Sequence, residues 1–213
     1  MALRDYLTVL LRGARLRVTR KILSLRIRVR HPTMICDPTA IWNYAYADLA
    51  NIEIGKNVSV LAYSEIIVYR QSRRSGVPGK LVLKDNALIS FGANIRAAGG
   101  HIEIGANSAI SQNCVVVAAN HRMGTGVNFI DTPWDEARTG VILGDNVWVG
   151  ANCTLLPGCR IGDNVIIAAG SVVRGTVPAS EIWGGIPARR LRSLLPIPDQ
   201  SIPDETPPDQ PAS

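Results

Sequence analysis

An aliphatic residue returns at every sixth position between residues 141 and 173. The segment reads VILGDNVWVGANCTLLPGCRIGDNVIIAAGSVV, and the recurring aliphatic side chains are Leu143, Val149, Leu155, Ile161, Ile167 and Val173. An amphipathic helix would place apolar residues three and four positions apart, and a half-buried strand would place them at every second position. A period of six fits neither pattern. It is typical of a short strand and a corner that are repeated and stacked as a parallel β-helix.

The same repeat occurs earlier in the chain and is broken by two longer stretches. It starts at Ile54, resumes at Leu83 and continues past a small bulge near Gly99 and Gly100. The first break is the basic stretch YRQSRRSGVPGK, and the second covers residues 120–140. A loop of this length that interrupts a regular solenoid is expected to have a function. We call each six-residue repeat a hexad. With three hexads in each triangular turn, the repeats predict an all-β solenoid of about five turns.

Asparagine recurs at the expected corners of the solenoid. Corners require backbone angles that most residues avoid, whereas Gly and Asn adopt them. The repeated asparagines are Asn57, Asn86, Asn107, Asn146 and Asn164.

The chain divides into three predicted parts. Residues 1–49 form a basic helix and a capping segment, and residues 50–195 form the solenoid domain. Residues 196–213 form a tail with four acidic residues and no basic one, rich in Pro. Because such a composition cannot bury enough apolar surface to fold, we expect the tail to be disordered.

The N-terminal segment shows two different periodicities. Apolar residues at helical spacing predict a helix from Ala2 to about Lys21, and the alternation LSLRIRVR predicts an edge strand from Leu23. Residues 1–30 carry nine Lys or Arg and one acidic residue, Asp5. Such a helix could cap the open end of the solenoid. It could also make peripheral contact with an anionic membrane, and one helix can do both.

Cysteine usage and the lack of long apolar runs indicate the compartment. The four cysteines form no CxxC pair, and no histidine lies at zinc spacing from them. Cys153 and Cys159 occupy small slots of the hexad and are predicted to be buried thiols. No run approaches the ~20 apolar residues of a membrane span, and no secretory leader is visible. We therefore expect a soluble, unprocessed cytoplasmic protein, at the inner face of the membrane if the N-terminus contacts lipid.

The hexads together with the closing segment VPASEIWGGIPARRLR resemble the hexapeptide-repeat acyltransferases. The similarity covers about residues 50–192 and is strongest to the galactoside, maltose and polysaccharide O-acetyltransferase branch. The resemblance implies a left-handed parallel β-helix with an N-terminal helix, one long excursion loop and a short C-terminal helix. It also implies a homotrimer with active sites between neighbouring subunits, acetyl-CoA as co-substrate, a saccharide acceptor, no nucleic acid and no metal.

Three histidines are candidates for the catalytic base. His31 lies outside the repeats, His101 lies at the short bulge, and His121 stands where the solenoid stops and the long loop begins. His121 also takes the position of the family's catalytic histidine. A neutral imidazole can take the proton of a sugar hydroxyl as it attacks a thioester, so His121 is the predicted general base, with no covalent intermediate. Its second ring nitrogen should be held by a carbonyl or carboxylate.

The resemblance also assigns the residues that bind the donor and the acceptor. The donor-binding residues are Trp148, Ala151, Ala169, Arg174, Gly175, Arg189 and Arg192. Arginine suits bidentate contact with the phosphates of CoA. The basic closing segment could instead be a solvated helix, and Trp148 could instead lie in a subunit interface. Asn94 and Asn120 are the candidates for binding the acceptor.

The predicted function is transfer of an acetyl group from acetyl-CoA to a hydroxyl of a saccharide, such as a cell-surface polysaccharide or its precursor. The alternative is a non-catalytic β-helix scaffold or binding module that docks through its basic N-terminus. A carbonic anhydrase with this fold would need three zinc-binding histidines, and His121 has no second histidine in its own repeat.

Overall fold

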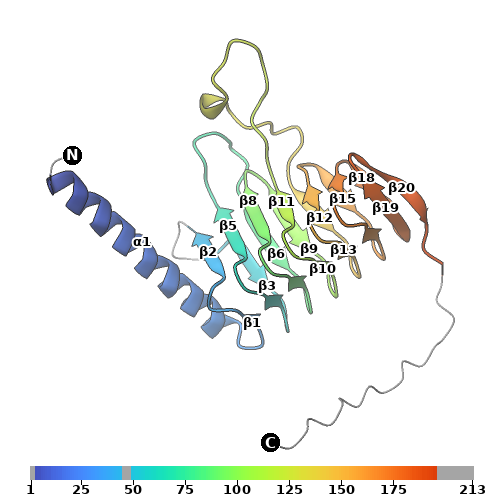
Figure 1. Cartoon of the computed structure of the whole chain (residues 1–213), viewed down its shortest axis with the longest axis horizontal. Coiled ribbons are helices and arrows are strands. Elements are labelled where there is room, and N and C mark those ends of the chain that lie inside the picture. Colours follow the sequence, from blue (N-terminus) through green and yellow to red (C-terminus); the bar gives the residue numbers. More distant parts are fainter. Residues whose placement is uncertain (1–2, 45–48, 196–213) are drawn as a thin grey trace, which may run out of the picture.

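A computed structural model describes residues 3–44 and 49–195 and shows three parallel sheets around one interior (Figure 1). The tail predicted to be disordered lies outside the described residues. The first sheet contains β1 (Ile35–Cys36), β4 (Ser59–Val60), β7 (Leu88–Ile89), β10 (Ala109–Ile110), β13 (Trp148–Val149), β16 (Ile166–Ile167), β19 (Glu181–Gly185) and β20 (Ala188–Ser193). The second sheet contains β2 (Ile41–Tyr44), β5 (Glu65–Tyr69), β8 (Asn94–Ala98), β11 (Val115–Val117), β14 (Thr154–Leu155) and β17 (Val172–Val173). The third sheet contains β3 (Ile52–Ile54), β6 (Lys80–Leu83), β9 (His101–Ile104), β12 (Val141–Leu143), β15 (Cys159–Ile161) and β18 (Thr176–Val177).

The chain visits the three sheets in turn, which confirms the parallel β-helix. Each strand pairs in parallel with the strand one turn later, as in the register Ile110↔Val149. The second and third sheets each have six strands, so the solenoid has one turn more than expected. The additional turn starts at Ile35, in a segment where Cys36 and Trp42 take the hexad positions that are aliphatic in the next turn.

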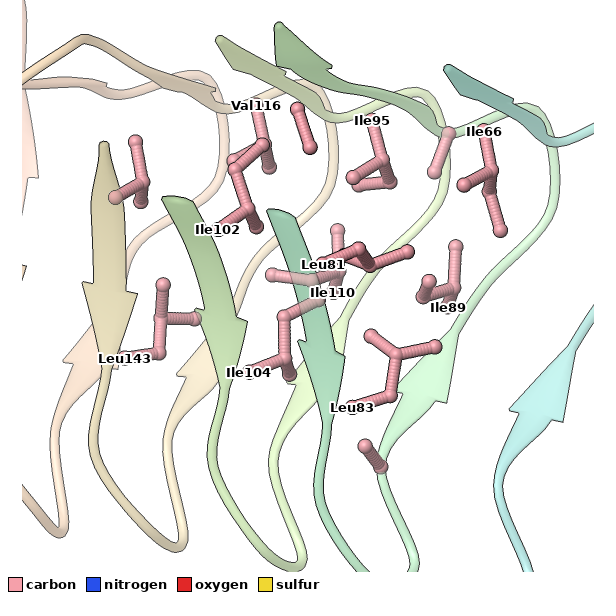
Figure 2. Close-up of a cluster of buried hydrophobic side chains, with 14 of the residues drawn as sticks. Ile66, Leu81, Leu83, Ile89, Ile95, Ile102, Ile104, Ile110, Val116 and Leu143 are labelled. Atoms are coloured by element: carbon pink, nitrogen blue, oxygen red, sulfur yellow. The ribbon is translucent and has the colours of Figure 1, made fainter. Parts of the chain in front are cut away.

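The aliphatic residues of the hexads fill the interior. Ile89, Ile95, Ile104 and Ile110 are fully buried, and side chains of successive turns lie above one another (Figure 2). Burying each contributes about 2 kcal/mol. Cys153 and Cys159 are free, buried thiols, as predicted.

Stacked asparagines stabilise one row of corners of the solenoid. All five predicted asparagines have a positive φ, and Asn146 has a φ of 55°. The Nδ2 of Asn146 donates to the Oδ1 of Asn164 at 2.8 Å, and Asn86 donates in the same way to Asn107 at 2.9 Å. These asparagines therefore supply both the backbone angle of their corner and a hydrogen bond to the next turn.

The N-terminal segment is one helix, α1 (Leu3–Arg30), so the edge strand predicted from Leu23 was wrong. Leu23 and Ile27 are buried in the core, whereas Leu25 and Val29 are exposed. The buried pair is four residues apart, which is the spacing of one helix face. The alternation arose because the opposite face of the same helix is also apolar. No helix in the described parts of the chain is long and apolar enough to cross a membrane.

The expected short C-terminal helix was also wrong, because the closing segment forms a hairpin of β19 and β20. β19 pairs in parallel with β16, and β20 pairs antiparallel with β19. Gly184 and Gly185 disfavour a helix here. An ion pair between Arg190 Nε and Glu181 Oε1, at 2.7 Å, joins the two strands.

We predict that the Asn146 corner depends on both properties of its side chain. Asn146→Gly keeps access to a positive φ and loses the hydrogen bond to Asn164, whereas Asn146→Ala loses both. We expect a loss of about 1 kcal/mol for Gly and about 2–3 kcal/mol for Ala. Urea unfolding followed by circular dichroism should give the order wild type, Gly, Ala. Equal stability of the two variants would contradict the role of the backbone angle.

Candidate active site

The long excursion leaves the solenoid after β11 and returns at β12, and its two legs are hydrogen-bonded to each other. It contains a short 3-10 helix, η1 (Phe129–Asp131). The Arg122 N–H donates to Pro133 O at 2.9 Å, and the Asp135 N–H donates to Asn120 O at 2.8 Å. These bonds flank His121 and fix its backbone, although the loop has no aliphatic core of its own.

The other interruption of the hexads, the loop between β5 and β6, supports the excursion. The Trp134 N–H donates to Arg74 O at 2.8 Å. The carboxylate of Glu136 accepts from the Gly76 N–H at 2.7 Å and from the Ser75 hydroxyl at 2.9 Å. These two donors hold the pKa of Glu136 below its usual value. The two irregular stretches therefore form one joined structure.

Trp134 also anchors the excursion to the solenoid. Its ring lies against Gly99, whose φ is 67°, and a Cβ at Gly99 would overlap the ring. The ring also meets the His121 imidazole edge to face, with centroids 6.2 Å apart. Gly99 thus provides the space that lets Trp134 support His121.

Hydrogen bonding fixes the tautomer of His121. Its Nδ1 lies 3.2 Å from Thr132 O and 3.4 Å from Thr132 Oγ1. The Thr132 hydroxyl donates its hydrogen to Phe129 O at 2.9 Å, so both neighbours of Nδ1 act as acceptors. In the neutral imidazole Nδ1 therefore carries the proton, and Nε2 has a free lone pair.

His121 lines a pocket of about 510 Å³ at the corner between the second and third sheets. The excursion supplies one wall, and the segments after β14 and β17 supply the other. Three arginines and one carboxylate make the pocket electropositive. Its lining residues are Asn120, His121, Arg122, Met123, Asp135, Arg138, Leu156, Pro157 and Arg174.

Three of the predicted site residues, Asn120, His121 and Arg174, meet in this pocket. Gly175 follows Arg174 at the same corner, with a φ of 72°. Asn94 is on β8, where its Nδ2 donates to Glu65 Oε2 at 3.0 Å, and it does not line the pocket.

The other predicted donor-binding residues lie elsewhere on the chain. Trp148 is on β13 in the first sheet, 55% exposed, and its Nε1 donates to Ser111 Oγ at 3.0 Å. Ala151 and Ala169 lie one above the other at the corner between the first and second sheets. Arg189 and Arg192 are exposed on β20. Within one chain, none of these five residues lines the His121 pocket.

The remaining histidines have other surroundings. His101 is at the start of β9, with Nε2 3.7 Å from Glu103 Oε2, and burial lowers its pKa. His31 follows α1, and burial lowers its pKa as well. Within residues 3–44 and 49–195, no three His, Cys, Asp or Glu side chains gather as a metal site.

Sequence reasoning missed the residues that hold and surround His121. Thr132, Asp135 and Arg138 belong to a stretch without periodicity, and nothing in the sequence marks them. Trp134 did carry a signal, because a large aromatic residue in a long polar loop is a candidate anchor.

We predict that Gly99→Ala displaces the excursion, because the new Cβ would overlap Trp134. Gly126→Ala is the matched control, since Gly126 has a φ of 73° and no atom near the position of a Cβ. Limited proteolysis within residues 120–140 should be faster in Gly99→Ala than in Gly126→Ala. Diethylpyrocarbonate should also modify His121 faster in Gly99→Ala. Equal rates in the two variants would show that Trp134 does not anchor the excursion.

Comparison with known proteins places the chain in a family. Residues 140–175 match the family model described as bacterial transferase hexapeptide (six repeats). A protein of Escherichia coli K12 assigned as a colanic acid biosynthesis acetyltransferase, WcaF, is 30% identical over 154 residues, which cover 72% of this chain and 76% of WcaF. Another from the same organism, assigned as a lipopolysaccharide biosynthesis O-acetyl transferase, WbbJ, is 27% identical over 190 residues, covering 83% and 87%.

A solved structure has a similar fold. It is a point mutant of AntD, an N-acyltransferase from Bacillus cereus, in complex with dTDP-4-amino-4,6-dideoxyglucose and coenzyme A. The TM-score is 0.60 at 18% identity, and the match covers 82% of this chain and 89% of AntD. The chain belongs to the hexapeptide-repeat family of acyltransferases, in the branch of galactoside, maltose and polysaccharide O-acetyltransferases, and its solenoid is a left-handed parallel β-helix.

Proposed function

We propose that the protein transfers an acetyl group from acetyl-CoA to a hydroxyl of a saccharide, with His121 as the general base. The supporting observation is the His121 imidazole itself. It lines the pocket, its Nδ1 is engaged by Thr132 O, and its Nε2 remains available to accept a proton. The joined loops and the pocket favour catalysis over a scaffold that only docks a partner.

The proposed reaction is a direct transfer. Nε2 of His121 takes the proton of the acceptor hydroxyl while the hydroxyl oxygen attacks the thioester carbonyl. The tetrahedral intermediate then collapses, the C–S bond breaks, and the CoA thiolate takes the proton from the imidazolium. Thr132 O keeps Nδ1–H oriented through both steps, because a carbonyl can accept that hydrogen bond throughout.

A covalent route through Cys114 fits the structure poorly. The Cys114 thiol is fully buried in the core. Its hydrogen bond with the Cys153 thiol, together with burial, raises the pKa of Cys114, so the nucleophilic thiolate is disfavoured.

The donor would be acetyl-CoA, bound by residues on or beside the first sheet and by residues at the His121 corner. WcaF and WbbJ are assigned as acetyl transferases, and AntD was solved with coenzyme A. In this proposal the small side chains of Ala151 and Ala169 let the pantetheine approach the backbone, and Trp148 lies near the thioester. Arg174 and Gly175 reach the donor from the side of the His121 pocket. Arg189 and Arg192 bind the phosphates.

A homotrimer would complete the site. Trp148, Ala151 and Ala169 lie on or beside the first sheet, whereas His121 projects from the corner between the other two sheets. A three-fold arrangement repeats one heterologous interface until the ring closes. Such an interface would set the first sheet of one subunit beside the His121 corner of the next.

The acceptor would be a saccharide of the cell surface or its precursor, bound with help from Asn120 and Asn94. The supporting relatives are assigned to colanic acid and lipopolysaccharide biosynthesis. In this proposal the enzyme is cytoplasmic and works at the inner face of the membrane.

We predict that His121→Asn lowers kcat by about 10²–10⁴, the contribution of a positioned base. The affinity for acetyl-CoA should stay the same, because the imidazole meets the acceptor hydroxyl and not the nucleotide. His101→Asn is the control and should retain turnover. The measurements are thiol release with a panel of saccharides and calorimetric titration of CoA. The rising limb of the pH–rate profile should also disappear in His121→Asn. Near-normal turnover of His121→Asn would assign the base to another residue.

We further predict that two impaired variants complement each other when they share a trimer. His121→Asn lacks the base, and Arg189→Ala/Arg192→Ala lacks the phosphate contacts, which should weaken CoA binding about tenfold, or about 1.4 kcal/mol. In trimers mixed at random, about one quarter of the interfaces pair two intact halves. Assayed at CoA concentrations well below the Kd of the arginine variant, co-refolded mixtures should recover about that fraction of wild-type activity. No recovery, or a monomer in light scattering, would contradict the shared site.

A further inference from the structure

The outer face of α1 carries an apolar stripe that no described part of the chain covers. The stripe consists of Leu11, Val18, Ile22, Leu25 and Val29, which are 65%, 57%, 52%, 62% and 75% exposed. An α-helix with about 3.6 residues per turn returns to the same direction after 18 residues, so Leu11 and Val29 lie on one line along the helix. The other three residues lie close to this line, so the stripe is straight.

The C-terminal half of α1 is fixed to the solenoid by its opposite face. Leu23 and Ile27 are buried in the hydrophobic core. The Arg28 Nη2 donates to Cys36 O at 2.7 Å, which ties the helix to β1. These anchors lie on the side of α1 toward the solenoid, and the stripe residues stay exposed. Val18 and Leu25 also border a groove of about 520 Å³ between α1 and β2.

Positive charge surrounds the stripe. The helix sequence contains nine Lys or Arg and one acidic residue, Asp5. By helical geometry, Lys21 and Arg26 lie on the two sides of the stripe. A shallow groove of about 360 Å³ beside α1 combines apolar Leu25 and Val29 with basic Arg26 and Arg30. Apolar side chains bordered by guanidinium groups suit a surface with acyl chains below and phosphate groups above.

We propose that α1 lies flat on an anionic phospholipid bilayer, with this stripe at the boundary between headgroups and acyl chains. A helix of this kind, apolar on one face and basic beside it, binds in the interface plane without crossing the bilayer. A second copy of the chain is a poorer occupant, because two such faces would bring the basic residues beside one stripe, such as Lys21 and Arg26, against those beside the other, and α1 contains one acidic residue, Asp5, to balance them. The membrane contact goes beyond the proposed acetyl transfer and does not depend on it.

The test is co-sedimentation of the full chain with phospholipid vesicles. We expect binding to vesicles of phosphatidylcholine with about one third phosphatidylglycerol, and at least tenfold weaker binding to phosphatidylcholine alone. Binding should weaken as salt rises from about 0.05 M to about 0.5 M, because added salt shortens the Debye length and screens the attraction between the basic residues and the anionic lipids. Equal binding to both vesicles, or none to either, would overturn the proposal.

Two pairs of variants locate the contact. Leu25→Ser/Val29→Ser and Lys21→Gln/Arg26→Gln should each weaken binding to the anionic vesicles about tenfold or more. All four side chains are exposed, so the fold should be retained. The controls remove an exposed leucine and two basic residues elsewhere, in Leu195→Ser and Arg73→Gln/Arg96→Gln, and should bind as wild type.

The readouts distinguish a lipid surface from a contact between copies of the chain. If Leu25→Ser/Val29→Ser changed the molecular mass in light scattering but left vesicle binding intact, the stripe would be a contact between copies and the proposal would fall. Acetyl transfer to a water-soluble saccharide should be the same in all these variants. A loss of transfer in His121→Asn would therefore leave the result on vesicle binding unaffected. A failure of vesicle binding would likewise leave the result on acetyl transfer unaffected.

Discussion

Each turn of this solenoid can bury its aliphatic residues only against the turns before and after it. The register between turns is therefore strict, and a change of one residue within a strand would turn its inward side chains outward. Extra residues can enter only at corners. All three interruptions use the same corner, between the second and third sheets: the loop after β5, the pair Gly99 and Gly100 after β8, and the excursion after β11. Consecutive turns thus place the three irregular segments side by side.

This common corner explains how the pocket is built. The loop after β5 holds Trp134 and Glu136 through backbone N–H and C=O groups and the Ser75 hydroxyl. The glycine at the next corner gives the Trp134 ring its space. The following corners then contribute Leu156 and Arg174 to the opposite wall. The regular part of the molecule determines where the irregular parts meet, and His121 lies at that meeting point.

The hexad period predicted the sheets, the core and the asparagine corners, because each depends on local repetition. It also indicated His121, since the period stops there. The helix through Leu23 and Arg30 was misassigned because two apolar faces of one helix produced an alternating pattern. The first turn was missed because Cys36 and Trp42 stand at positions that are aliphatic in the next turn, at Val60 and Ile66. The contact of Thr132 O with His121 could not be predicted, since an aperiodic loop leaves no sequence signal for its contacts.

The two ends of the solenoid are closed by different structures, and this has a consequence for solubility. Parallel strands leave unpaired backbone groups at each end of a sheet, and a stack of identical turns could add a second molecule there. At one end α1 packs beside β2, the edge strand of the second sheet. At the other end β20 reverses direction and covers the edge of β19, with Arg189, Arg190 and Arg192 along an exposed strand. The antiparallel direction breaks the repeat, and the charges disfavour a further strand, so end-to-end polymerisation into fibres is prevented at the edge of the first sheet.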